Sequence, residues 1–130
     1  MPKIYQVLAS TFNAYKNCIA ANNTDWKELH ANKIENIMRD NLPHGSGFDA
    51  GCTFDFDKSK VNNLVINFDY HKMDDNGFYA GWYGYRVFIT PSLANGFELR
   101  IVGPNKEDKP YFYETLGNML DAEYPGGENA

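Results

Sequence analysis

The sequence predicts an α+β domain in which two N-terminal helices precede a four-stranded antiparallel meander sheet and a C-terminal helix follows it. Apolar residues recur at steps of three and four up to about residue 41, which is the period of an amphipathic helix. Between residues 53 and 102 they alternate with polar residues, which is the period of a strand. The helical period returns after residue 108. This order, ααββββα, favours a sheet with helices on one face and an open second face.

The two leading helices are expected over residues 2–21 and 25–41. The first has an apolar stripe that runs from Ile4 to Ile19. Few residues join the two helices, so we expect them to be antiparallel neighbours. The second helix should end before Pro43, because the residue preceding a proline disfavours the helical conformation. Its apolar stripe consists of Trp26, Leu29, Ile34, Ile37 and Met38.

Four strands are expected at about residues 53–57, 64–71, 79–90 and 97–102. Asn-Gly pairs precede the third and the fourth strand, and Asn-Gly is a strong signal for a hairpin turn. The last helix should begin at Asp108, with Pro110 in its first turn. The chain has 130 residues, of which 43% are hydrophobic, so we expect one domain over residues 1–130. The polar residues 124–130 are expected to fray.

Composition disfavours several classes of function. The net charge is −5 and no run of Lys or Arg occurs, so direct nucleic-acid binding is disfavoured and a basic protein surface is the more natural partner. Two cysteines and three histidines lie too far apart for a zinc motif, so we expect free thiols and no cofactor or metal. No apolar run approaches the roughly 20 residues of a membrane span and no signal peptide is visible, so a cytoplasmic location is expected.

The open face of the expected sheet is the candidate functional surface. Strand alternation predicts that this face is acidic, with one histidine, two arginines and one or two large aromatic side chains. Such a face admits three interpretations: a solvated surface with cross-strand charge pairs, a protein-binding surface, for which Trp and Arg are typical, or a catalytic or metal site. The binding interpretation leads, with a monomer or an edge-paired homodimer both open. Its candidate residues are Asp55, Asp57, Asp69, His71, Gly81, Trp82, Gly84, Arg86 and Arg100.

The alternative is a metal-dependent or hydrolytic enzyme. Asp69 and His71 share a strand face, and His44 and Asp49 lie in the glycine-rich loop before the first strand. Two histidines with carboxylates suit a divalent ion or a general-base pair. The spacing matches no known catalytic motif, however, and the loop "HGSGFDAG" follows a helix and precedes a strand, unlike a nucleophile elbow.

The third strand is unusual, because "GFYAGWYGYR" interleaves three glycines with aromatic residues. A glycine inside a strand often marks a bulge or the close approach of another chain. We therefore expect Gly81, Trp82, Gly84 and Arg86 to be the centre of the binding surface.

Three segments, "LPHGSGFDAG", "YHKMDDNGFYAGW" and "VFITPSLANGFELRIVG", resemble small proteins of phages, plasmids and other bacterial mobile elements. The resemblance covers about residues 42–103 and brings no catalytic residue with it. It implies a setting, the cytoplasm of a bacterial host, in which small acidic proteins often bind or inhibit a host or defence protein.

Overall fold

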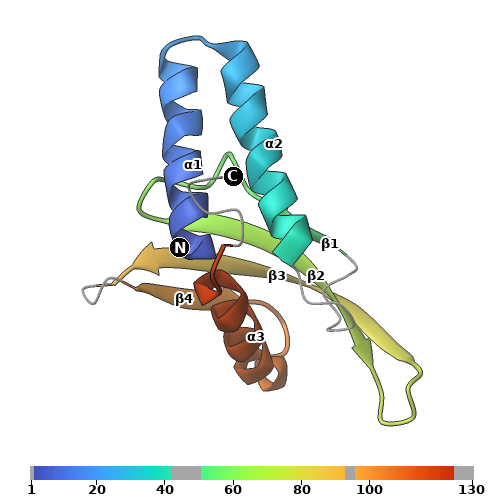
Figure 1. Cartoon of the computed structure of the whole chain (residues 1–130). Helices are drawn as coiled ribbons and strands as arrows, with labels where there is room; N and C mark the ends of the chain where they lie inside the picture. The colour runs from blue at the N-terminus through green and yellow to red at the C-terminus, as the bar shows by residue number, and fades with distance from the viewer. Residues whose placement is uncertain (1, 42–50, 93–95, 125–130) are drawn as a thin grey trace.

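The computed structural model describes residues 2–41, 51–92 and 96–124 and confirms the expected architecture (Figure 1). The strands form one antiparallel sheet in the order β1-β2-β3-β4. Along the chain, two helices precede this sheet and one helix follows it. The elements are α1 (Ile4–Ala20), α2 (Thr24–Asn41), β1 (Gly51–Phe54), β2 (Leu64–Met73), β3 (Tyr79–Pro91), β4 (Phe97–Val102), a short 3-10 turn η2 (Lys106–Asp108) and α3 (Lys109–Asp121).

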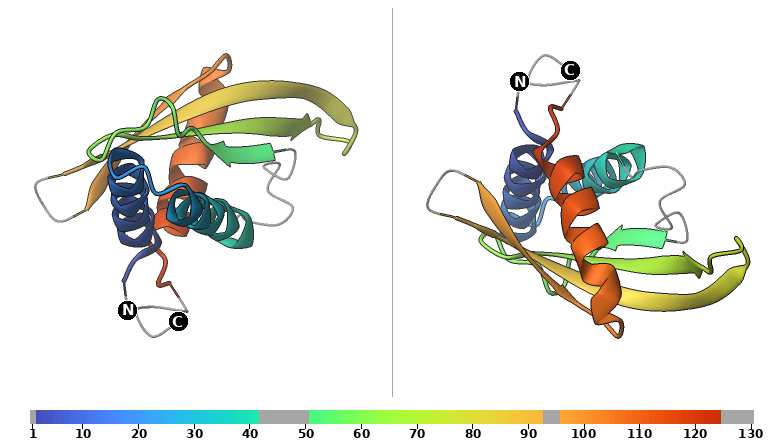
Figure 2. Two further views of the ribbon diagram at one scale, coloured as in Figure 1. Left: turned by 90° about the horizontal axis from the view of Figure 1, so that it is seen from above. Right: turned by 90° about the horizontal axis from the view of Figure 1, so that it is seen from below.

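All three helices pack on the same face of the sheet. Figure 2 shows α1 and α2 side by side against the curved sheet. The Phe12 ring of α1 contacts Phe54 of β1, with 5.3 Å between ring centroids. Phe112 of α3 contacts Phe68 of β2 at 5.3 Å, and Phe54 and Phe68 lie on the same face of the sheet, because Phe54 pairs with Ile66, two residues before Phe68. Among residues 2–41, 51–92 and 96–124, no helix therefore covers the opposite face.

Phe112 is the centre of the packing between α3 and the sheet. It has no exposed surface, and its ring centroid lies 4.6 Å from Tyr85 and 4.8 Å from Tyr70. Edge-to-face contacts of this kind add to the free energy gained by burying apolar area. This cluster fixes the middle of β2 and β3, the part of the sheet from which the open face is built.

The expected apolar stripe of α2 is wrong at its first two positions. Trp26 and Leu29 are 55% and 54% exposed, whereas Ile34 and Met38 are buried. At 3.6 residues per turn, Leu29 lies about 140° around the helix from Ile34 and cannot share its face. The ends of α1 and α2 at which the two helices are joined also extend past the sheet (Figure 1).

β1 is shorter than expected, because the chain turns at Asp55 instead of continuing to Asp57. The Asp55 carboxylate accepts a hydrogen bond from the Lys58 backbone N–H at 3.0 Å, a local contact that stabilises turns. Ser59 then folds back onto β2, where its hydroxyl accepts from the Val65 N–H at 2.8 Å. Asp55 and Asp57 therefore lie in a turn beside the sheet and not in a strand.

The two ends of the described chain lie side by side. Ile4 N–H donates to the Ala122 carbonyl at 3.1 Å, and Tyr124 N–H donates to the Pro2 carbonyl at 2.9 Å. Lys3 and Glu123 form an ion pair at 3.0 Å. Tyr124, where fraying was expected to begin, is thus hydrogen-bonded, and the remainder of that tail lies outside the described residues.

A helix side chain covers part of each sheet edge. The Ile101 N–H of β4 donates to the Tyr113 hydroxyl of α3 at 3.4 Å. At the other edge, burial raises the pKa of the Glu35 carboxyl of α2, and the nearby Phe54 backbone N–H opposes this effect. Such contacts blunt the edges against pairing with other chains. None of the helices in the described residues is long and apolar enough to cross a membrane.

Candidate functional site

The strand register decides which side chains meet on the open face. Asp69 pairs with Gly84, and His71 pairs with Trp82. Residues directly opposite each other in a sheet point to the same side, so these positions share the open face as the sequence predicted. In the adjoining rows Asn67 pairs with Arg86 and Phe88 pairs with Arg100.

Gly81 is the exception among the strand positions. It pairs with Lys72, whose ammonium reaches the helix side and contacts Asp108 at 3.3 Å. The hydrogen bond and charge of Asp108, together with Glu107, raise the pKa of Lys72 against the opposing effect of desolvation. Gly81 therefore belongs to the face that holds the hairpin against η2.

A hollow of about 620 Å³ lies on the open face, over β2, β3 and β4. Its lining combines hydrogen-bond donors, one carboxylate and apolar surface. The lining side chains that face outward are Asn67, Asp69, Arg86, Phe88, Arg100 and Val102, with Gly84 between them.

One guanidinium group of the hollow is held by a chain of hydrogen bonds. Arg86 Nε donates to Asn67 Oδ1 at 3.1 Å, and Asn67 Nδ2 donates to Asp55 Oδ2 at 3.0 Å. Desolvation opposes ionisation of Asp55, but the Lys58 N–H, the Asn67 amide and the charges of Lys58 and Arg86 together lower its pKa. Asp55 thus orients Arg86 through Asn67. Both of its carboxylate oxygens already accept hydrogen bonds, from the Lys58 N–H and the Asn67 amide.

The second guanidinium group lies flat on an aromatic ring. The Arg100 Cζ is 4.4 Å from the centroid of Phe88, a cation–π contact that fixes the group while leaving its N–H donors in solvent. Within the described residues neither Arg86 nor Arg100 forms an ion pair. Two oriented cations therefore line one hollow, and no carboxylate in the described part of the chain is paired with them.

The positions directly beside Asp69 on the two neighbouring strands carry no side chain. Its neighbours on the adjacent strands are Gly51 of β1 and Gly84 of β3. A Cβ atom added at Gly84 would lie 3.6 Å from Asp69 Oδ1, which is an ordinary contact. The Asp69 side chain has no hydrogen bond or ion pair to any described residue.

The three glycines of the segment "GFYAGWYGYR" differ in whether the fold requires glycine at their positions. Gly77 occupies the hairpin turn with a φ of +80°, a conformation that favours glycine. At Gly81 a Cβ would lie 2.6 Å from the Tyr83 ring, so that ring would have to move. Gly84 has neither constraint, because its φ is ordinary and its surroundings admit a side chain. Packing and backbone geometry therefore do not account for glycine at position 84.

An aromatic group lies next to the hollow, towards the tip of the β2–β3 hairpin. The His71 ring centroid is 4.7 Å from Tyr79 and 5.8 Å from Trp82. Tyr79 and Trp82 are 57% and 56% exposed, and Met73 beside them is 53% exposed. This end of the hairpin projects beyond the helices (Figures 1 and 2), which leaves the aromatic group uncovered.

Tyr79 was not among the residues predicted for the open face, because strict alternation from Trp82 along β3 would point it to the helix side. The register shifts between Lys72 and Met73, so that Met73 pairs with Tyr79 and Ala80 is left without a partner. This bulge moves Tyr79 to the face of His71. Gly81, adjacent to the extra residue, was the signal for it.

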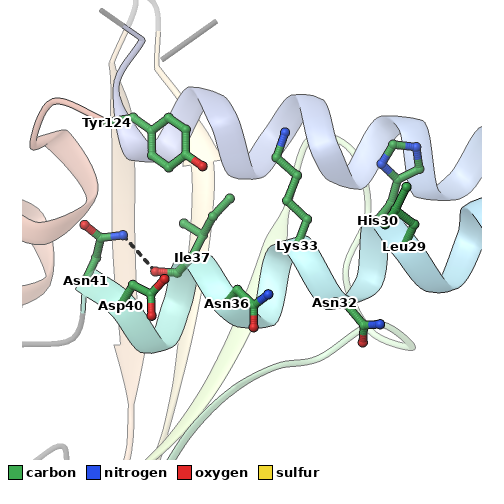
Figure 3. Close-up of a pocket in the computed structure, with 9 residues that line it drawn as sticks. All are labelled: Leu29, His30, Asn32, Lys33, Asn36, Ile37, Asp40, Asn41 and Tyr124. Atoms are coloured by element: carbon green, nitrogen blue, oxygen red, sulfur yellow. Dashed lines mark hydrogen bonds between the residues drawn. The ribbon is translucent and has the colours of Figure 1, made fainter. Parts of the chain in front are cut away.

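A second hollow, also of about 620 Å³, lies along α2 and is lined by α2 residues and by Tyr124. Figure 3 shows Lys33 pointing towards α1, with Leu29 and His30 beyond it and Tyr124 at the opposite end. One of its polar side chains is hydrogen-bonded to the backbone of its own helix: Asn41 Nδ2 donates to the Ile37 carbonyl at 2.9 Å (Figure 3). The hollow on the open face differs in that two guanidinium groups, those of Arg86 and Arg100, line it.

The described residues contain no group of three His, Cys, Asp or Glu side chains that could hold a metal ion. Asp69 and His71 do share a face, but His44 and Asp49 lie outside the described residues, so the four cannot be placed together. Burial, reinforced by the charge of Glu35, raises the pKa of the Cys52 thiol to about 12, which makes it a poor nucleophile.

Comparison of the chain with protein-family models, with curated proteins and with solved structures finds no match. The resemblance to mobile-element proteins therefore stays a prediction, and the site must be interpreted from its own chemistry.

Proposed function

We propose that this chain is a small accessory protein of a phage or another mobile element that binds a protein partner through its open sheet face. The setting rests on the sequence resemblance. In that setting the partner is a host or defence protein, and occupation of its surface would inhibit it.

The observation that supports binding is an uncovered sheet face with exposed aromatic side chains next to oriented arginines. Trp, Tyr and Arg are the side chains most enriched at the energetic centres of protein interfaces. Trp82 and Tyr79 present large apolar area, and Arg86 and Arg100 present donors within the same surface. The net charge of −5 would speed encounter with a partner whose surface is basic overall.

The two tryptophans provide a matched test. Trp82 lies on the open face and Trp26 on α2, and they are 56% and 55% exposed. Tagged wild-type protein, Trp82→Ala and Trp26→Ala are used to capture proteins from a bacterial lysate, and the affinity of each specifically captured protein is then measured. We expect Trp82→Ala to weaken binding by at least about 30-fold, the 2 kcal/mol that defines a hot spot.

Trp26→Ala should leave that affinity within a factor of two or so, since single surface changes outside an interface cost under about 0.5 kcal/mol. The reverse pattern, with Trp26→Ala weakening capture and Trp82→Ala neutral, would place the interface on the helices and refute the proposal.

A further inference from the structure

We infer that the hollow on the open face receives an aspartate or glutamate side chain of the protein partner, held between the guanidinium groups of Arg86 and Arg100. The inference rests on the proposed function and specifies the chemistry of its contact. It depends on three features: two cations that pair with no carboxylate of the described residues, their spacing, and a glycine beside Arg86 where a side chain would fill part of the hollow.

The two cations are oriented before any partner arrives. Arg86 uses its Nε to bond Asn67 at 3.1 Å, so its terminal N–H groups remain for a ligand. Arg100 is fixed 4.4 Å above the Phe88 ring. A guanidinium group that is already oriented loses less conformational entropy on binding a carboxylate. Charge-assisted bonds between arginine and a carboxylate are about twice as strong as neutral hydrogen bonds.

The register places Asp69, Arg86 and Arg100 on a diagonal across three strands. Arg86 lies one strand over and two residues along from Asp69, because Asp69 pairs with Gly84. Arg100 has the same relation to Arg86, because Arg86 pairs with Val102. Each step combines about 4.8 Å between strands with about 6.8 Å along a strand, so the Cα atoms of consecutive residues on the diagonal are about 8 Å apart. A carboxylate between the two arginines, with its two oxygens, can accept from both.

Asp69 limits what the hollow accepts. Its carboxylate lies one diagonal step from Arg86 and has no bond to any described residue. Its negative charge therefore disfavours ligands that carry more than one negative charge. A single carboxylate is therefore favoured over phosphate or a nucleic-acid backbone, in keeping with the net charge of −5. A partner surface that is basic around one acidic side chain would match both Asp69 and the arginines.

Glycine at position 84 keeps the hollow open beside Arg86. A side chain there would stand in the hollow between Asp69 and Arg86, although the fold itself would tolerate it. Glycine leaves the sheet backbone open to close approach by the partner.

A matched pair of small probes tests the inference without knowledge of the partner. N-acetylglutamate α-amide and N-acetylglutamine α-amide differ only in carboxylate against carboxamide. Each is titrated into the labelled full chain while the Nε–Hε signals of its arginines are followed by NMR. We expect the glutamate probe to shift Arg86 and Arg100 saturably in the millimolar range, and the glutamine probe to shift neither. Arg39, exposed on α2, is the internal control and should not saturate.

Variants then separate this inference from the proposed function. Arg86→Gln should abolish saturation at Arg100, Arg100→Gln should abolish it at Arg86, and Arg39→Gln should change neither. Equal shifts with both probes, or tighter saturation by inorganic phosphate than by the glutamate probe, would overturn the inference. Loss of partner binding in Trp82→Ala with no response to the glutamate probe would leave the proposed function standing and remove the carboxylate. Binding of the glutamate probe, together with unchanged partner affinity in Trp82→Ala, would support the carboxylate site and refute the proposed function.

Discussion

Replacing Gly84 by valine should make the fold more stable and the binding weaker. Gly84 is exposed in the interior of β3, and a Cβ there meets only Asp69 Oδ1 at 3.6 Å. Its φ is ordinary, so valine can adopt the native backbone without strain. The isopropyl group would extend into the hollow, where the partner is expected to approach the sheet.

The magnitude follows from the cost of glycine in a strand. Removing the extra backbone freedom of glycine at a compatible site stabilises a protein by about 0.4–1 kcal/mol, and valine also suits a strand, on a scale that spans about 1 kcal/mol. We therefore expect Gly84→Val to raise the free energy of unfolding by about 0.5–1 kcal/mol. For a domain of this size that corresponds to a rise in Tm of about 3–5 °C per kcal/mol.

Urea denaturation measures the stability, and the glutamate probe measures the hollow. Gly81→Val is the matched control, because its Cβ would lie 2.6 Å from Tyr83, and it should lower the free energy of unfolding. If Gly84→Val destabilises the protein as well, glycine at position 84 is structural and the argument for the hollow loses one of its three supports. If Gly84→Val is stabilising yet binds the probe as well as wild type, the hollow is not the site.

Three further results are expected. Phe112→Ala should lower the free energy of unfolding by about 3–5 kcal/mol, measured from the urea midpoint, because the buried ring fills the space between α3 and the sheet. Asn67→Leu should raise the pKa of Asp55, followed by carboxyl NMR, since it removes a hydrogen bond that lowers that pKa; the lowered pKa contributes stability above the unfolded value of about 3.9 that is lost as the pH falls through the folded value, and the variant should lose less stability over that acid range. Cys52, with a pKa of about 12, should resist iodoacetamide at pH values near 8 in the folded protein and react in urea; equal rates in the two states would show that the thiol is accessible.

The side of the sheet to which most strand residues point could be predicted from the sequence, because alternation is a local property of each strand. Asp69, His71 and Arg86 lie on the open face as period-two alternation requires. Tyr79 does not follow the alternation, since one unpaired residue in β3 reverses the side to which it points. Glycine at position 81 indicated a bulge, but not which residues would change face.

The hollow could not be predicted in the same way, because it depends on the register between strands. That Asp69 meets Gly84 and not Arg86 follows from long-range pairing, which alternation along one strand does not contain. The exposure of Trp26 and Leu29 has a similar cause. The helical period gives the faces of α2, whereas tertiary packing decides which face is covered and how far the sheet reaches.

The acidic character expected of the open face also changes once contacts are known. Asp55 is occupied by Asn67 and Lys58, and Asp57 lies in the turn beyond β1. The hollow itself is lined by one carboxylate and two guanidinium groups. Sequence reasoning counted charges on the face, whereas hydrogen bonding decides which of those charges remain for a partner.

The most direct test of the central claim is an amide NMR footprint of the full chain bound to the protein that it captures. The account predicts that the largest signal changes fall on the open face of β2, β3 and β4, from Asn67 to His71, from Tyr79 to Phe88 and at Arg100, and that α1 and α2 remain unchanged. A footprint centred on Trp26, Lys33 and the α1–α2 seam, with the open face unaffected, would contradict it.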